Sequence, residues 1–171
     1  MHSLLRLSAF SGLILSGAIF GFFYAWVCST MWGLDTADPK VAIAAMQAMN
    51  ASVRNAVFAP AFFGTPLALF LTAVLAFKAG RRDAVWPFAA AGVIYLVGGM
   101  LLTMLVNVPM NEALALVQIP ADPAEAARIW DDYSPRWQVW NQTRTLVSGI
   151  TLCLAGYGML RLGKSPGRVP A

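Results

Sequence analysis

The sequence contains almost none of the residues from which metal and disulfide sites are built. Its 171 residues include one histidine, His2, and two cysteines, Cys28 and Cys153. One chain therefore cannot build a zinc, haem or copper site from histidines. No Cys-x-x-Cys pair occurs, and the two cysteines fall at different depths of the fold predicted below, so we expect no disulfide. We accordingly expect no metal site built from histidine or cysteine.

Charged residues are also scarce. They make up 12% of the chain, whereas hydrophobic residues make up 58%, and a typical soluble domain carries about 25% charged residues. The apolar residues gather in four long runs, at about residues 7–32, 57–77, 85–108 and 139–160. Each run reaches the roughly 20 residues that an α-helix needs to cross a hydrocarbon core of about 30 Å.

These runs predict the fold class. Backbone polar groups in lipid must be satisfied within the segment, so each run is expected to be a helix rather than an open strand. We therefore predict an all-α integral membrane four-helix bundle, forming a single membrane domain over residues 1–171. A signal peptide is the alternative for the first run. That run is longer than the about 7–15 apolar residues of a signal peptide, and no A-x-A-type cleavage site follows it.

The few charges are distributed unevenly around the four runs. Seven of the twelve basic residues fall on one side: Arg6, Lys78, Arg81, Arg82, Arg161, Lys164 and Arg168. Seven of the eight acidic residues fall on the other side: Asp35, Asp38, Glu112, Asp122, Glu125, Asp131 and Asp132. The positive-inside rule assigns the basic side to the cytoplasm, so we expect cytoplasmic termini and a bacterial inner membrane. The net charge of +4 thus reports topology, and no nucleic-acid partner is expected.

The segments on the acidic side carry helix signals of their own, at about residues 38–56 and 109–136. Asp38-Pro39 is typical of an N-cap followed by proline at the first helical position. Asp122-Pro123-Ala124-Glu125 predicts a short helix to about Asp132, and Ser134-Pro135 predicts a new start for the last helix. A short helical cap is therefore expected on the extracytoplasmic side of the bundle.

Polar side chains cluster where three of the predicted helices reach the cap. They are Asn50 and Arg54, then Asn107 and Asn111, then Trp137, Asn141 and Arg144 with Trp140 beside them. Residues four and seven apart share a helical face. A charge such as Arg144 at or below the membrane interface is costly and indicates function. Together these groups would line a pocket for an oxygen-rich, planar, apolar ligand.

Simpler interpretations exist for the same residues. Arg144 can extend its side chain toward water, or pair with Asp131 or Asp132. Trp130, Tyr133, Trp137 and Trp140 fit an interfacial aromatic belt. The G-x-x-x-G spacing of Gly17 and Gly21 fits either helix packing within the chain or a homo-oligomer.

Four sequence pieces give the chain a family resemblance. They are Gly21-Phe22-Phe23-Tyr24-Ala25, Met49-Asn50 with Phe58 and Phe62 further on, Asn107-Val108-Pro109-Met110-Asn111, and the W-x-x-W-N-x-x-R of Trp137 to Arg144. In these pieces the chain resembles the anthrone oxygenase-like family of four-span membrane proteins. The resemblance covers most of the chain, and the Asn-Val-Pro-x-Asn and Trp-Asn-x-x-Arg pieces are its most specific parts.

The resemblance implies oxidation of an anthrone to an anthraquinone by O2, without metal or organic cofactor. Such chemistry needs an apolar pocket, donors that stabilise an enolate oxygen, and a base. We assign the donor role to Arg144, Asn141, Asn107 and Asn111, and the base to Glu112 in preference to Asp131 and Asp132. Contacts to the substrate are expected from Asn50, Arg54, Trp137 and Trp140.

Two non-catalytic functions remain open from the sequence. The protein could bind a lipid or quinone-like molecule in the same pocket without chemistry. It could also be a structural subunit of a membrane complex, in which the asparagines and Arg144 tie helices together. The expected partners are an apolar small molecule and the lipid bilayer.

Overall fold

The computed structural model describes residues 2–163. Two basic residues that predict the orientation, Lys164 and Arg168, lie outside that range. Within it the chain forms helices and short connections, and no strand. The helices are α1 (His2–Ala25), the π-helical turn η1 (Trp26–Thr30), α2 (Met31–Asp35), α3 (Pro39–Ser52), α4 (Phe58–Lys78), α5 (Arg82–Ile94), the π-helical segments η2 (Tyr95–Leu101) and η3 (Thr103–Asn107), α6 (Val108–Ala115) and α7 (Pro123–Gly163).

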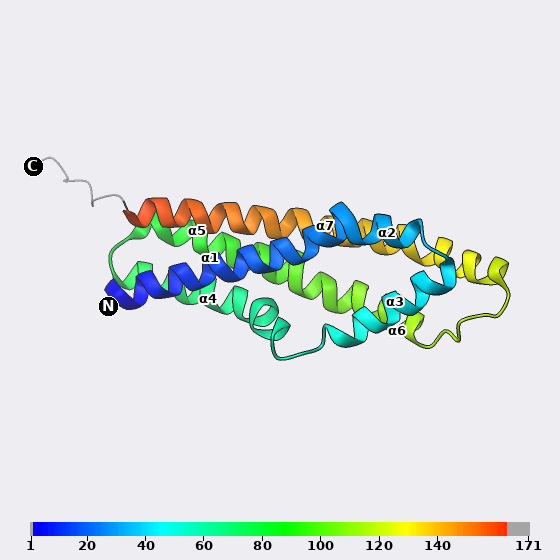
Figure 1. The fold of residues 1–171 in the computed structure, drawn as a ribbon. Helices are drawn as coiled ribbons and strands as arrows, with labels where there is room; N and C mark the ends of the chain where they lie inside the picture. The colour runs from blue at the N-terminus through cyan, green and yellow to red at the C-terminus, as the bar shows by residue number, and fades with distance from the viewer. Residues whose placement is uncertain (1, 164–171) are drawn as a thin grey trace, which may run out of the picture.

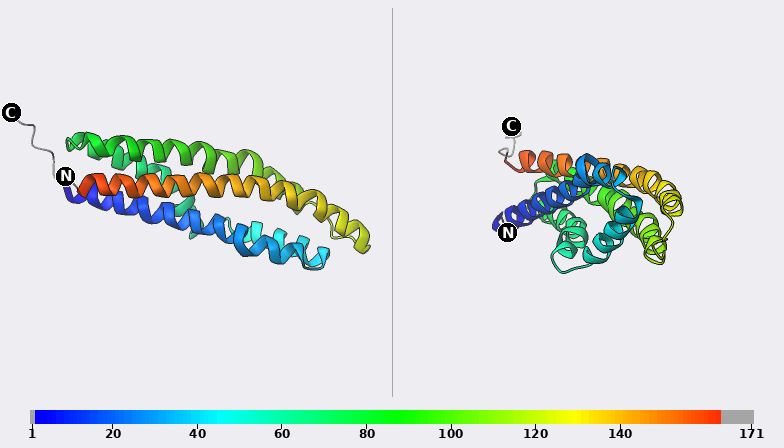
Figure 2. Two further views of the ribbon diagram at one scale, coloured as in Figure 1. Left: turned by 90° about the horizontal axis from the view of Figure 1, so that it is seen from above. Right: turned by 45° about the vertical axis from the view of Figure 1, so that its right-hand side comes forward.

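These elements join into four long rods (Figure 1), which span residues 3–35, 58–78, 82–115 and 123–163. Each rod is long and apolar enough to cross a membrane. α1 packs against α4 and α7, and α5 packs against the same two helices, so the four rods close into a bundle. Figure 2 shows α7 between α1 and α5. The predicted all-α integral membrane bundle is confirmed.

The length of α4 places the bundle in the bilayer. Its 21 residues extend over about 31 Å, close to the roughly 30 Å of a hydrocarbon core. Its two ends therefore mark the two boundaries of the core. The other rods continue past Phe58, and α2, α3, α6 and the start of α7 lie together at that end of the molecule (Figure 1). We call this the cap end, and the opposite end the basic end.

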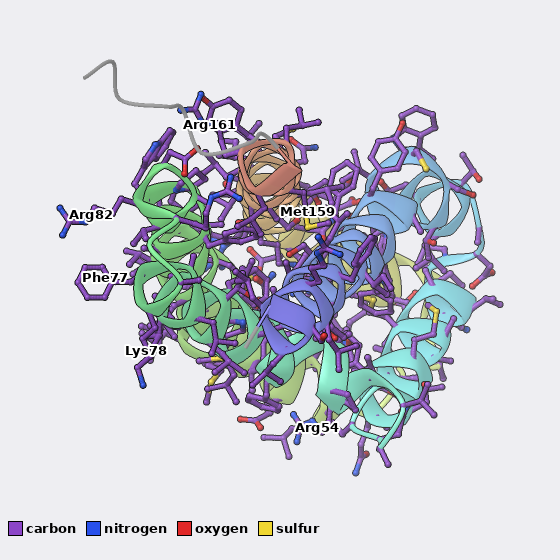
Figure 3. The ribbon with its side chains drawn as sticks, turned by 90° about the vertical axis from the view of Figure 1, so that its left-hand side faces the viewer. Arg54, Phe77, Lys78, Arg82, Met159 and Arg161 are labelled. Carbon is purple, nitrogen blue, oxygen red and sulfur yellow. The ribbon has the colours of Figure 1, made fainter. Side chains whose placement is uncertain are left out.

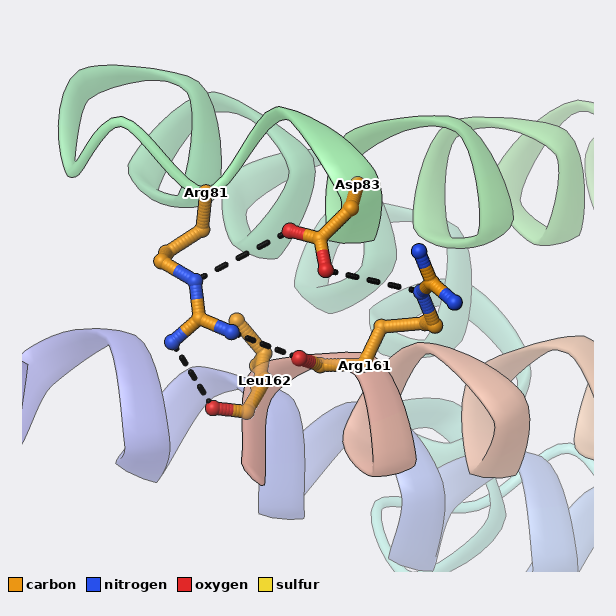
Figure 4. Close-up of polar contacts among 4 residues, drawn as sticks. All are labelled: Arg81, Asp83, Arg161 and Leu162. Carbon is orange, nitrogen blue, oxygen red and sulfur yellow. Dashed lines mark hydrogen bonds and ion pairs between the residues drawn. The ribbon is translucent and has the colours of Figure 1, made fainter. Parts of the chain in front are cut away.

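Arg81 ties the turn between α4 and α5 to the last turn of α7 at the basic end (Figure 4). Its Nη1 donates to the carbonyl of Leu162 at 2.9 Å, and its Nη2 donates to the carbonyl of Arg161 at 2.6 Å. The last carbonyls of a helix have no partner within the helix and carry its negative dipole end, so a guanidinium suits them. Asp83 lies 3.4 Å from Arg161 Nε and completes the cluster. Figure 3 shows this end of the bundle, with Lys78, Arg82 and Arg161 at its rim.

The prediction that a new helix begins at Ser134-Pro135 is wrong, because α7 runs unbroken from Pro123 to Gly163. Proline at position 135 removes one helical hydrogen bond, to the carbonyl of residue 131, which belongs to an exposed residue. The continuous helix gains other hydrogen bonds in return. Asp35 at the end of α2 accepts hydrogen bonds from Trp130 Nε1, Ser134 Oγ and Gln138 Nε2, at 3.0, 2.6 and 2.9 Å. These donors share one face only in an unbroken helix.

The interpretation of Trp130 and Tyr133 as an interfacial belt is also wrong. Their exposed fractions are 4% and 7%, and both side chains donate hydrogen bonds within the protein. They pack with Met31, Ile43 and Met46, which come from α2 and α3. The cap therefore has its own apolar core, into which α7 inserts its aromatic face. Trp140, by contrast, is 39% exposed.

A proline and a tyrosine compensate each other inside the bundle. Pro66 lies within α4 and has no N–H, so the carbonyl of Phe62, four residues earlier, loses its helical partner. The hydroxyl of the fully buried Tyr95 donates to that carbonyl at 3.1 Å. Two polar groups that would each be costly alone thus satisfy one another.

A double-mutant cycle tests this compensation. Tyr95→Phe should lower the free energy of unfolding by about 1–2 kcal/mol, because it leaves a buried carbonyl unpaired. In a Pro66→Ala background the cost should be much smaller, since the restored amide at position 66 can bond the Phe62 carbonyl. Unfolding in detergent micelles measures all four proteins. An equal cost of Tyr95→Phe in both backgrounds would contradict the assignment.

Candidate functional site

A cavity of about 550 Å³ lies where the four rods meet the cap. Side chains from α1, η1, α3, α4, η3, α6 and α7 line it, together with the connection of residues 53–56. Aromatic rings form most of the wall: Phe22, Phe23, Trp26, Phe58, Phe62, Phe63 and Trp137. The polar lining consists of Asn50, Arg54, Asn55, Thr103, Asn111 and Arg144. The space is apolar with a few fixed polar groups, which is typical of small-molecule sites.

The cavity exists because α3 does not run directly into α4. Asn55 holds the turn between them: its Oδ1 accepts from the amides of Val57 and Phe58, and its Nδ2 donates to the carbonyl of Ser52. The side chain thus caps the start of α4 and binds the last turn of α3. α4 consequently begins where α3 ends, and α3 lies beyond it in the cap (Figure 1).

Arg144 is the only charged residue of α7 that is buried among the described residues, with an exposed fraction of 5%. Its Nε donates to Asn141 Oδ1 at 3.0 Å, and its Nη1 lies 3.4 Å from Thr103 Oγ1. No carboxylate within residues 2–163 pairs with it. Both simple interpretations of Arg144 are therefore wrong, because the side chain does not reach water and does not pair with Asp131 or Asp132. Asp132 instead lies 3.8 Å from Arg136.

Aromatic rings hold the guanidinium in place of an anion. Its central carbon lies 4.3 Å from the centre of the Phe23 ring and 5.1 Å from the centre of the Trp137 ring. Such cation–π contacts contribute about 2 kcal/mol when desolvated, far less than a buried charge loses on leaving water. Asn141 adds support, because its Nδ2 donates to the carbonyl of Phe23 at 3.3 Å while its Oδ1 accepts from Arg144. The positive charge has no counter-charge within the part of the chain that the structure describes.

Asn111 organises the wall on the other side of Trp137. Its Oδ1 accepts from Tyr133 Oη and from Trp137 Nε1, each at 2.8 Å. Its Nδ2 donates to Asn50 Oδ1 at 3.0 Å. The indole N–H can only donate, so the orientation of the Asn111 amide is fixed. Asn111 thus joins α3, α6 and α7 across one edge of the cavity.

The three π-helical segments lie beside the cavity or directly precede the residues that line it. η1 follows directly after Phe23 and Ala25, and the hydroxyl of Thr30 donates to the carbonyl of Ala25 at 3.3 Å. η3 carries Thr103, whose hydroxyl donates to the carbonyl of Gly99 at 2.7 Å and faces Arg144. π-Helical turns inside α-helices are rare and occur often at functional sites. Here they reposition side chains of two rods beside the cavity.

The structure brings five of the nine sequence-predicted site residues to the cavity wall: Arg144, Asn111, Asn50, Arg54 and Trp137. The other four lie elsewhere. Asn141 is buried and bonds Arg144 without lining the cavity, and Trp140 is exposed and does not line it either. Asn107 is fully buried, and neither of its amide atoms has a hydrogen-bond partner among the described residues. Glu112 lies on the surface, 3.0 Å from Arg54.

The sequence interpretation missed most of the aromatic wall as part of the site. Phe22 and Trp26 are four residues apart on the first rod, and Phe58 and Phe62 are four apart on α4, so each pair presents one face. The rings of Phe22 and Phe58 lie 4.9 Å apart. Paired aromatic spacings at the same predicted depth were the available signal. Thr103 gave none, because its placement depends on the π-helical backbone.

Two guanidinium groups line the cavity: that of the exposed Arg54, which pairs with Glu112, and that of the buried Arg144. No acidic side chain lines the cavity, and no group of three or more His, Cys, Asp or Glu within residues 2–163 could hold a metal ion. A buried cation in an aromatic pocket attracts an anion strongly, because the surroundings screen little. The arrangement is therefore suited to a flat ligand that carries negative charge on oxygen.

Comparison with protein families matches residues 46–154 of the chain to the anthrone oxygenase family. The matched segment begins within α3 and ends within α7, and it contains all five of the predicted residues that line the cavity. No curated protein and no solved structure matches the chain.

Because the charge of Arg144 is buried, we predict that replacing this residue by an apolar one stabilises the protein. Arg144→Met should raise the midpoint of thermal unfolding by a few degrees, because it removes a desolvated charge that has no counter-charge. Arg136→Met, the same change at an exposed position of the same helix, should have almost no effect. Thermal unfolding in micelles compares the two. A decrease of more than about 5 °C for Arg144→Met would mean that this side chain mainly ties helices together.

Proposed function

The chain belongs to the anthrone oxygenase family, and we propose that it oxidises a planar phenolic substrate of the anthrone type with O2 in the cavity beside Arg144. The observation that carries the proposal is the buried guanidinium without a counter-charge, enclosed by aromatic rings. The rings fit a flat fused-ring molecule, and the guanidinium fits an oxygen that gains negative charge during the reaction.

The chemistry follows from the enolate of such a substrate. An anthrone loses a proton from its ring CH2 group and becomes an enolate, whose charge rests largely on the oxygen across the ring. The electron-rich carbon then reacts with O2, and a carbon–oxygen bond forms. Loss of water gives the carbonyl of the anthraquinone. One oxygen atom of O2 stays in the product, and the other leaves as water with the two hydrogens of the CH2 group.

Each neighbouring residue then has a role in the proposal. Arg144 presents Nη2, which makes no hydrogen bond within residues 2–163, to the enolate oxygen. Asn141 and Thr103 orient the guanidinium, so they act on the substrate through Arg144. Glu112 is our candidate for the base that accepts the proton, since it binds Arg54 at the edge of the cavity. No metal or organic cofactor takes part in the steps we propose.

We also propose that the cap faces away from the cytoplasm, in a bacterial inner membrane. Arg6, Lys78, Arg81, Arg82 and Arg161 gather at the basic end, and seven of the eight acidic residues lie toward the cap. The positive-inside rule then puts both termini in the cytoplasm. On this orientation the cavity lies in the outer half of the bilayer.

Binding of a quinone-like molecule without chemistry is the second candidate. The observation in its favour is that no acidic side chain lines the cavity, so the proton must leave by way of the mouth if a reaction occurs there. Both candidates use Arg144 in the same way. Only consumption of O2 separates them.

Oxygen uptake with anthrone is the test of the proposed activity. Purified protein in lipid nanodiscs should consume one O2 for each anthraquinone formed. Arg144→Leu should lower the rate by at least a factor of 100, because it removes the group that stabilises the enolate. Arg136→Leu, at an exposed position, is the control.

Three results would count against the proposal. Turnover that survives Arg144→Leu would show that the site assignment is wrong. Uptake that a chelator abolishes would show that the reaction needs a metal. Binding of 9,10-anthraquinone without any uptake of O2 with anthrone would favour the non-catalytic candidate.

A further inference from the structure

The cavity wall reaches the outside of the bundle between α4 and η3. Phe63 of α4 and Met104 of η3 both line the cavity, yet their exposed fractions are 49% and 46%. A side chain that belongs to both the cavity wall and the outer surface marks an opening. Phe62, the neighbour of Phe63, is buried inside, so the edge of the opening runs along one side of α4.

This opening faces lipid rather than water. Phe63 is five residues from the start of α4, which places it about 7.5 Å inside the membrane boundary. Met104 belongs to the apolar rod of residues 82–115. Its neighbour Leu105 is 73% exposed, which suits a surface in contact with acyl chains. Large apolar side chains therefore flank the opening at the depth of the hydrocarbon core.

The packing of the rods explains why α4 and η3 do not close over the opening. α4 packs against α1, α5 and η2, whereas η3 packs against η2, α6 and α7. The contact between these two rods therefore ends near η2, and α4 and η3 separate as they approach the cap. The turn at Asn55 then leads the chain away from α4 toward α3.

The cavity also reaches the surface on the cap side, where Arg54, Asn55 and Ala56 line it and are exposed. The ion pair of Arg54 and Glu112 joins the end of α3 to α6 at 3.0 Å. Arg54 also lines the cavity, so this pair crosses the cavity mouth on the cap side. Figure 3 shows Arg54 at the edge of the bundle beside α3 and α4. A polar bridge between the cavity and water contrasts with the apolar gap between the cavity and lipid.

We propose that the opening between Phe63 and Met104 is a lateral portal, through which a planar apolar ligand passes between the bilayer and the cavity. The proposal rests on the proposed function only in that the cavity binds such a ligand. A fused-ring molecule dissolves in acyl chains far better than in water, so the membrane is its reservoir. The ligand enters edge-on between the two side chains and meets Arg144 at the inner end.

Blocking a portal has a kinetic signature that differs from damage to a binding site. A narrowed entrance slows association and dissociation by the same factor and leaves the dissociation constant unchanged. A damaged wall weakens binding without slowing release. The measurement is stopped-flow quenching of tryptophan fluorescence, with the full chain in nanodiscs and 9,10-anthraquinone as the ligand, supplied from and withdrawn into vesicles.

Met104→Trp is the test variant, and Leu105→Trp is its matched control, because Leu105 is exposed to lipid but does not line the cavity. Met104→Trp should slow both association and dissociation at least tenfold and keep the dissociation constant within about threefold. Leu105→Trp should behave like the wild-type protein. If Met104→Trp does not fold, Phe63→Trp with the control Leu67→Trp serves equally, since Leu67 is likewise exposed and outside the cavity.

Three results would overturn the portal. Unchanged rates in Met104→Trp would place the entrance elsewhere. Weaker binding with unslowed release would make Met104 a part of the binding wall only. An equal slowing in Leu105→Trp would show a general effect of bulk on this surface. The ligand is not a substrate for further oxidation, so a protein that consumes no O2 with anthrone can still pass or fail this test.

Discussion

The buried guanidinium of Arg144 is the interaction on which the rest of the site depends. A charge removed from water needs a counter-charge or a dense set of hydrogen bonds. Arg144 has two polar contacts and two aromatic rings, and no carboxylate within the described chain. The folded protein therefore holds a charge that is only partly compensated. A negatively charged ligand would supply the missing counter-charge of Arg144. The resulting binding energy would then be available where the chemistry would occur.

The surrounding structure keeps that charge in place. Asn141 joins Arg144 to the backbone of α1, and Asn111 fixes Trp137 from the opposite side. The unbroken α7 carries Trp137, Asn141 and Arg144. Its outer part is held in place by hydrogen bonds to Asp35. The same separation of α4 from η3 that creates the cavity also opens it to lipid. Stability, binding and access thus depend on one arrangement of helices at the membrane boundary.

The sequence predicts the bundle well and the site only in part. Uncharged runs of about 20 residues permit one structure in lipid, so the spans could be predicted. Arg144, Asn111 and Asn50 could be found because polar groups are costly at that depth. Asn107 could not be placed, since it ends a π-helical segment, and such a segment shifts side chains by about one position. Glu112 adjoins Asn111 in the chain but lies about 100° further around α6, where it is exposed. The prediction at Pro135 was also wrong. The local sequence predicts a helix start there, but the hydrogen bonds of Asp35 to α7 stabilise a continuous helix.

The absorption spectrum of a bound hydroxyanthraquinone tests most directly whether Arg144 takes an anion. Free 1,8-dihydroxyanthraquinone is neutral at pH 7, and its phenolate absorbs at longer wavelength. The wild-type protein in nanodiscs should shift the spectrum of the bound molecule to that of the anion at pH 7, and Arg144→Met should not. A bound ligand that keeps its neutral spectrum in the wild-type cavity would contradict the claim that the ligand supplies the missing counter-charge.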